Sequence, residues 1–125
     1  MGVKIYRYIP TFLWVTGILV ASFMPSSHIS PSLYLFPHQD KVVHACMYFG
    51  LAFLFLLNSR HSFKITTIFF IISILSICAM SGLIEILQPI LSSRTADIAD
   101  FVANSIGALV GGGIVFHWIK SKEQE

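Results

Sequence analysis

Four long apolar segments alternate with short polar ones along this chain. The apolar segments run over about residues 9–24, 40–58, 65–88 and 97–119. A helix needs about 20 mainly apolar residues to cross the hydrocarbon core of a bilayer, and these segments approach or exceed that length, the first being the shortest. The pattern therefore predicts an all-α integral membrane protein, a bundle of four transmembrane helices that forms one domain over residues 1–125.

The composition agrees with a membrane protein. The 125 residues are 55 % hydrophobic and only 11 % charged, whereas a soluble domain has about a quarter charged residues. Cys46 and Cys78 lie inside apolar segments, which favours a packing role for both. Because no cysteine and histidine spacing is typical of a zinc site, we expect no metal and no cofactor, and nothing in the sequence indicates a nucleic-acid partner.

The basic residues predict the orientation of the bundle. Four spans place both termini on one side, and only Lys41 and Arg94 then lie on the other side. The remaining lysines and arginines share the side of the termini: Lys4, Arg7, Arg60, Lys64, Lys120 and Lys122. Because lysine and arginine are enriched in cytoplasmic loops, we expect both termini in the cytoplasm.

Polar residues gather at the ends of the helices that this orientation turns outward. Asp40, His44 and Tyr48 recur every four residues, so they share one helix face. From the helical rise, His44, Glu85 and Asn104 lie roughly 5–10 Å below the outer helix ends. Ionisable groups at membrane depth are costly and usually functional, so we predict one outward-facing polar pocket. Its expected members are Asp40, Lys41, His44, Tyr48, Glu85, Gln88, Arg94, Asp97, Asp100 and Asn104.

Within this pocket we expect His44, Glu85 and Arg94 to lie in one cluster. Arg94 and Lys41 are the only formal cations on that side, so either can hold a phosphate, Arg94 through a bidentate fork. Glu85 or His44 is a candidate catalytic base if the site performs chemistry. The headgroup or ligand would be bound and oriented by the other expected members: Asp40, Lys41, Tyr48, Gln88, Arg94, Asp97, Asp100 and Asn104.

A purely structural role for these residues is the alternative. Asp40 would then be the N-cap of its helix, and His44 would bond a backbone carbonyl. Glu85 would form an ion pair with Lys41 or Arg94 that fixes the bundle, and Asp97 and Asp100 would cap the fourth helix.

A small-residue motif on the fourth segment predicts close helix packing. Gly107 and Gly111 form a GxxxG pattern, which lets helix backbones approach each other in lipid. The same face is a candidate contact for a homo-oligomer.

The polar residues together resemble a known family. The segments Asp40-Lys41-x-x-His44-x-x-x-Tyr48 and Glu85-x-x-Gln88, followed by Arg94, Asp97, Asp100, Asn104 and Gly107, are similar to the VanZ-like family. These are small bacterial membrane proteins related to an accessory protein of teicoplanin resistance. The resemblance covers nearly the whole chain.

The resemblance implies a multi-pass protein of the bacterial inner membrane that acts in cell-envelope biology or in resistance to glycopeptides and lipoglycopeptides. The expected partner is a membrane lipid or a lipid-linked wall precursor. Three functions stay open at this point: binding of such a headgroup, catalysis on a phosphorylated lipid within the membrane, and a non-enzymatic structural role, with or without oligomerisation.

Overall fold

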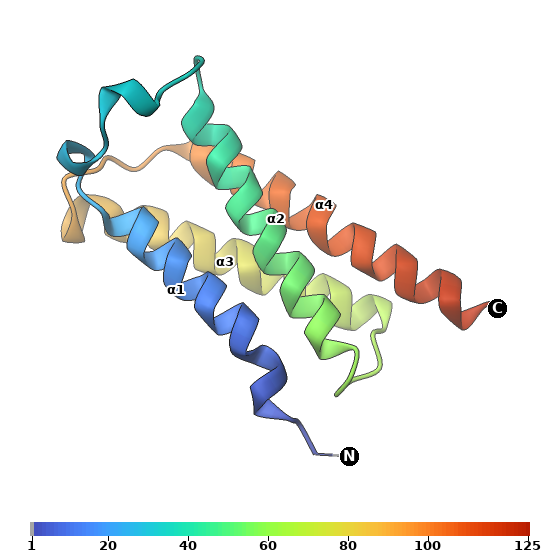
Figure 1. The fold of residues 1–125 in the computed structure, drawn as a ribbon. Helices are drawn as coiled ribbons and strands as arrows, with labels where there is room; N and C mark the ends of the chain where they lie inside the picture. Colours follow the sequence, from blue (N-terminus) through green and yellow to red (C-terminus); the bar gives the residue numbers. More distant parts are fainter. Residues whose placement is uncertain (1) are drawn as a thin grey trace.

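A computed structural model describes residues 2–125 as a bundle of four long helices (Figure 1). The helices are α1 (Ile9–Phe23), α2 (Gln39–Ser59), α3 (Thr67–Leu91) and α4 (Ile98–Glu123). Successive helices alternate in direction, so the two termini and the α2–α3 loop lie toward the same end of the bundle. Within these described residues four helices are long and apolar enough to cross a membrane, which confirms the predicted all-α, four-span architecture.

The ends of the helices differ from the predicted boundaries, and α4 continues to Glu123 where the prediction ended it near residue 119. A 3₁₀ turn, Ile5–Tyr8, runs directly into α1 and gives a helical segment of 19 residues, Ile5–Phe23, so the shortest segment also reaches membrane-spanning length. Pro89 does not end α3, which continues to Leu91. Because proline lacks an N–H group, the carbonyl of Glu85 loses its normal donor within the helix.

The closest packing in the bundle is between α2 and α4. A Cβ atom added to Gly107 would collide with the carbonyl oxygen of Ala45, and one added to Gly111 would collide with that of Phe49. The two glycines therefore lie where the backbones of the helices touch. Since α2 of the same chain covers this face, the expectation that the Gly107 and Gly111 face joins two copies is wrong.

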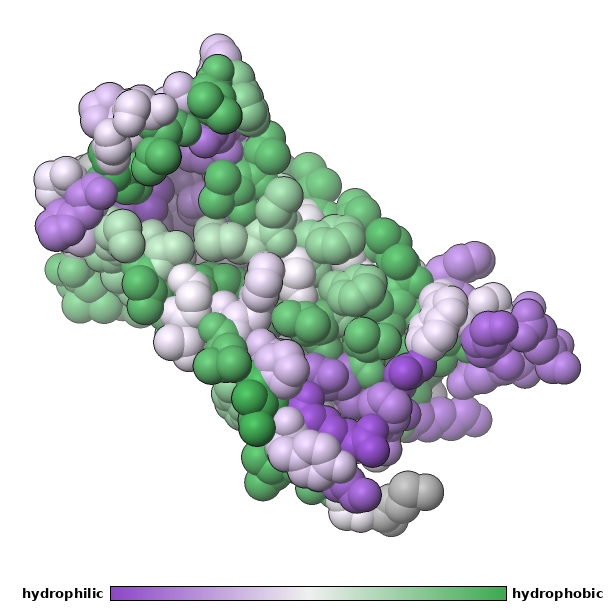
Figure 2. All heavy atoms as spheres, viewed as in Figure 1, coloured by the Kyte–Doolittle hydropathy of each residue, from purple (hydrophilic) through white to green (hydrophobic). Residues whose placement is uncertain are grey.

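Helix α1 packs more loosely, and two side-chain hydrogen bonds join it to α2: one from Trp14, and one that Asn58 Nδ2 donates to Thr11 Oγ1 over 2.9 Å. The Trp14 indole N–H donates to the carbonyl oxygen of Met47 over 2.7 Å, and its ring covers Gly50 so closely that a Cβ there would overlap it. Hydrophobic side chains cover the middle of the visible face of the molecule, and hydrophilic ones lie at both ends, with the larger group at the end where the termini lie (Figure 2). This distribution is the one expected of a protein surrounded by lipid.

The orientation in the membrane can be tested by labelling single cysteines. In a background without Cys46 and Cys78, we expect a cysteine at Ser27 or Ser93 to react with a membrane-impermeant maleimide added outside intact cells. A cysteine at Ser62, in the α2–α3 loop, should react only after the membrane is opened. External labelling at Ser62 together with protection of Ser93 would reverse the predicted orientation.

Candidate functional site

One lysine connects α2 to α4 at the end of the bundle opposite the termini. The Lys41 ammonium group lies 2.6 Å from Asp97 Oδ2, 2.5 Å from Asp100 Oδ1 and 3.3 Å from Asp40 Oδ2. We call these four residues the Lys41 cluster. Asp97 is also the N-cap of α4, since its Oδ1 accepts from the backbone N–H of Ala99 at 2.8 Å. The cluster thus fixes the first turn of α4 against the first turn of α2.

Asp40 does not cap its helix. The N-cap position of α2 is occupied by His38, which has a left-handed backbone with φ 59°. The alternative in which Asp40 is only an N-cap is therefore wrong. Asp97 lies just outside the membrane-spanning helix, and hydrogen bonding from Lys41 holds the pKa of its carboxyl below the usual value.

Glu85 is buried and binds the backbone of the α3–α4 connection. Its Oε1 accepts from the N–H of Asp97 over 2.7 Å. Among residues 2–125 it forms no ion pair with Lys41 or Arg94, so the expected pairing of Glu85 with either cation is wrong. Glu85 on α3 and His44 on α2 are both buried at this end of the bundle.

Three buried polar groups below the Lys41 cluster are incompletely bonded. His44, Tyr48 and Asn104 are only 5 %, 1 % and 2 % exposed. His44 Nδ1, Tyr48 Oη and Asn104 Oδ1 have no hydrogen-bond partner within the described part of the chain. His44 Nε2 lies 4.0 Å from Asp100 Oδ2 and its other nitrogen bonds no carbonyl, so the carbonyl-bonded histidine of the structural alternative is not observed.

Ser81 completes this buried polar group and was not among the predicted site residues. Its hydroxyl accepts from the Asn104 side-chain amide over 2.7 Å. Ser81 belongs to the polar stripe of α3 that includes Glu85 and Gln88 at helical spacing, so the sequence contained the signal that identifies it.

Gln88 and Arg94 bind the end of α1. Gln88 Nε2 donates to the carbonyl oxygen of Ser22 over 2.9 Å, and Arg94 Nη1 donates to that of Ala21 over 3.2 Å. The last carbonyls of a helix have no partner within it, so they are natural acceptors. Arg94 consequently stands apart from the carboxylates. Of the predicted cluster of His44, Glu85 and Arg94, His44 and Arg94 line one pocket, but within the described residues Arg94 makes no ion pair with Glu85, and Lys41 is the cation that pairs with the aspartates.

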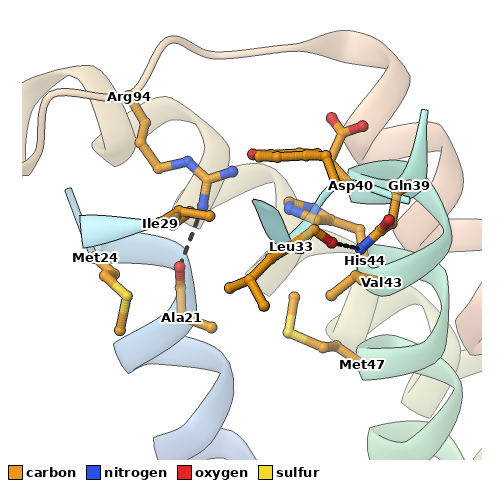
Figure 3. A pocket seen from close by; sticks show the side chains of 11 residues that line it. Ala21, Met24, Ile29, Leu33, Gln39, Asp40, Val43, His44, Met47 and Arg94 are labelled. Carbon is orange, nitrogen blue, oxygen red and sulfur yellow. Dashed lines mark hydrogen bonds between the residues drawn. The ribbon is translucent and has the colours of Figure 1, made fainter. Parts of the chain in front are cut away.

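Arg94 instead faces a pocket of about 250 Å³ between the end of α1 and the start of α2. Figure 3 shows Arg94 on one side of this Arg94 pocket and Asp40 and His44 on the other. The remaining lining is mainly apolar: Ala21, Met24, Ile29, Leu33, Tyr34, Gln39, Val43 and Met47. His44 is the residue that connects the pocket to the buried polar groups beneath the Lys41 cluster.

The loop between α1 and α2 forms one wall of the pocket. Gln39 fastens this loop, since its Nε2 donates to the Leu33 carbonyl over 2.9 Å and its Oε1 accepts from the Leu35 N–H over 2.6 Å. Leu33 and Tyr34 line the pocket, and like Leu35 and Phe36 they keep much of their side chains exposed. The apolar loop therefore both covers the site and offers side chains to the membrane interface.

Comparison with known proteins identifies the family. No curated protein and no solved structure matches the chain. The sequence model of one family, described as VanZ/LLP1, matches residues 3–120, which include α1, α2, α3, all of α4 except its last three residues, and every residue of the site. The chain therefore belongs to the VanZ/LLP1 family and is a multi-pass membrane protein of that family.

Proposed function

We propose that this protein binds the phosphate-containing headgroup of a membrane lipid or lipid-linked wall precursor in the Arg94 pocket. In this proposal the pocket faces the outer leaflet of the bacterial inner membrane, as the distribution of basic residues predicts. The observation that supports it most directly is the position of Arg94, a cation without a carboxylate partner in a largely apolar pocket.

Lys41 and Arg94, the two cations at this end of the bundle, differ in the partners that they bind. Lys41 is shared by three aspartates and has no remaining charge to offer a ligand. Within residues 2–125, Arg94 forms no ion pair, and its side chain makes one hydrogen bond, to a backbone carbonyl. A guanidinium has five N–H donors in a planar fork, so Arg94 keeps enough of them for bidentate contact with a phosphate.

Binding at this position would place the protein in cell-envelope biology. A headgroup held at the outer surface is withdrawn from its neighbours, and the local composition of the membrane surface changes. A lipoglycopeptide such as teicoplanin reaches its target through that surface, so headgroup binding offers a physical route to the resistance implied by the family.

A second candidate function, catalysis on a phosphorylated lipid, is favoured by His44. This histidine lines the same pocket as Arg94, has one unpartnered nitrogen, and lies near the Asp100 carboxylate on its other side. A carboxylate behind an imidazole is the arrangement that orients a general base. Release of phosphate from a bound lipid by the purified protein, abolished by His44→Gln, would favour this function over binding alone.

Replacing Arg94 tests the headgroup proposal. We expect Arg94→Gln to weaken retention of dioleoyl phospholipids about 10-fold, because a charge-assisted hydrogen bond contributes about 1.5–3 kcal/mol. Arg94→Lys should be intermediate, since it keeps the charge and loses the fork. Native mass spectrometry of the detergent-solubilised protein measures the retained lipid.

Arg7→Gln is the matched control, because it removes an arginine from the opposite end of the bundle. Dioleoylglycerol, which has no phosphate, is the control ligand. Equal phospholipid retention by wild type, Arg94→Gln and Arg7→Gln would reject the proposal and favour the structural alternative.

A further inference from the structure

We propose that the Arg94 pocket selects a zwitterionic phosphoethanolamine headgroup, with its phosphate on Arg94, its ammonium group on Asp40, and the lipid tail lying between α1 and α2. This inference rests on the proposed function, since it names the class of lipid that the same site binds.

The charges that line the pocket are of opposite sign on opposite walls. Arg94, which comes from the connection between α3 and α4, lies beside the end of α1. Asp40 lies across the cavity on α2 (Figure 3). A purely anionic headgroup would be attracted by Arg94 and repelled by Asp40. A headgroup with a phosphate and an ammonium group can instead pair its phosphate with Arg94 and its ammonium group with Asp40.

Asp40 is the aspartate of the Lys41 cluster that is most available to a ligand. Its contact with Lys41 is 3.3 Å long, whereas Lys41 approaches Asp97 and Asp100 to 2.6 and 2.5 Å. The side chains of Asp40 and Asp97 are 39 % and 45 % exposed, against 8 % for Asp100, and of the three only Asp40 lines the Arg94 pocket. Lys41 therefore compensates Asp40 only in part, and the remaining negative charge faces the pocket.

The size of the pocket favours a small headgroup. A volume of about 250 Å³ is below the range of roughly 300–1,000 Å³ that encloses a drug-sized ligand. Phosphate and ammonium joined by two carbons fit such a space. The large saccharide and peptide part of a wall precursor does not, so among the lipids left open above the geometry favours a phospholipid.

An apolar groove continues from the pocket along the membrane-spanning part of the bundle. This groove of about 410 Å³ lies between α1 and α2 and shares Met47 with the Arg94 pocket. Trp14, Gly17 and Ile18 contribute the α1 side of its lining. A hydrocarbon chain in this groove would hold its headgroup at the level of Arg94, so the ligand is a membrane lipid and not soluble phosphoethanolamine.

A competition between two lipids tests the selectivity. The wild-type protein, in detergent with equal amounts of dioleoyl phosphatidylethanolamine and dioleoyl phosphatidylglycerol, should retain the ethanolamine lipid at least about 5-fold better in native mass spectra. Asp40→Asn should remove this preference while keeping total phospholipid retention. Glu123→Gln, a carboxylate change at the opposite end of the bundle, should keep the preference.

A second comparison needs no variant and so does not depend on folding of Asp40→Asn. N-acetylated phosphatidylethanolamine keeps the phosphate and loses the ammonium charge, and wild-type protein should retain it no better than phosphatidylglycerol. Soluble glycerophosphoethanolamine at the same concentration should displace less than half of the bound lipid. Complete displacement would overturn the role of the tail groove.

The outcomes separate this inference from the function on which it rests. Suppose that Arg94→Gln loses both phospholipids. If wild type then shows no preference for the ethanolamine lipid, or if Asp40→Asn still shows this preference, only the zwitterionic selectivity is rejected. If Arg94→Gln retains both lipids as wild type does, the headgroup function itself is rejected, and this inference with it.

Discussion

The Gly107→Leu variant is expected to melt far below the wild-type protein in detergent, whereas Gly113→Leu on the same helix is expected to melt close to it. At Gly107 the first added carbon already collides with the backbone carbonyl of Ala45. At Gly113 a Cβ meets nothing within 4 Å. A backbone cannot move aside as a flexible side chain can, so α2 and α4 must separate, at a cost of about 3 kcal/mol.

Alanine substitutions at the same two positions make the comparison sharper. Gly107→Ala should still destabilise the bundle, because its single methyl group occupies the colliding position. Gly113→Ala should stabilise it by about 0.5–1 kcal/mol, because alanine is the better helix former where space is open. Thermal unfolding of the purified variants measures both. Equal melting of the two alanine variants would mean that α2 and α4 do not approach as closely as Gly107 and Ala45 indicate.

Hydrophobic pattern was sufficient to predict the four helices because membrane-spanning segments are defined by length and composition, both of which are local properties. The predicted segments of about 40–58 and 65–88 correspond to Gln39–Ser59 and Thr67–Leu91. The end of α3 was less predictable, since Pro89 in a last turn removes one hydrogen bond and the helix can continue for two residues.

Helical spacing also predicted which polar side chains lie on a shared face. Asp40, His44 and Tyr48 on α2 do lie at the end where Glu85 and Asp100 lie on α3 and α4. Periodicity and topology together fix the face and the depth of a residue on a helix.

The partners of the two cations could not be predicted in the same way. Arg94 lies in a loop, where no period sets the direction of its side chain, and its acceptor is a backbone carbonyl at Ala21. Every residue has a backbone carbonyl, so nothing in the sequence indicates that the carbonyl of Ala21 is the acceptor for Arg94. The 2.5 Å contact of Lys41 with Asp100 depends instead on how closely α2 and α4 approach, which the glycines of α4 permit.

Removing the cation of the Lys41 cluster should have the other large effect. We expect Lys41→Met to destabilise the protein by about 2 kcal/mol, because the nearly buried Asp100 carboxylate loses its only lysine or arginine partner within the described residues. Lys64→Met, at the opposite end of the bundle, should cost little. Adding Asp97→Asn and Asp100→Asn to Lys41→Met should restore most of the lost stability, since the aspartates would no longer repel each other.

The pH dependence of this loss distinguishes charge from packing. Lys41 lowers the pKa of Asp97 in the folded state, so the stabilisation from this pair is present above the unfolded pKa of about 3.9 and is lost as the pH falls through the lower folded value. The melting temperatures of wild type and Lys41→Met should therefore differ most near pH 7, begin to converge below about pH 4, and meet once the pH is below the folded pKa of Asp97. A gap that stays constant over this range would show that Lys41 stabilises the helices by the packing of its aliphatic stem. Equal melting of Lys41→Met and Lys64→Met at pH 7 would show that the cluster does not hold α2 to α4 at all.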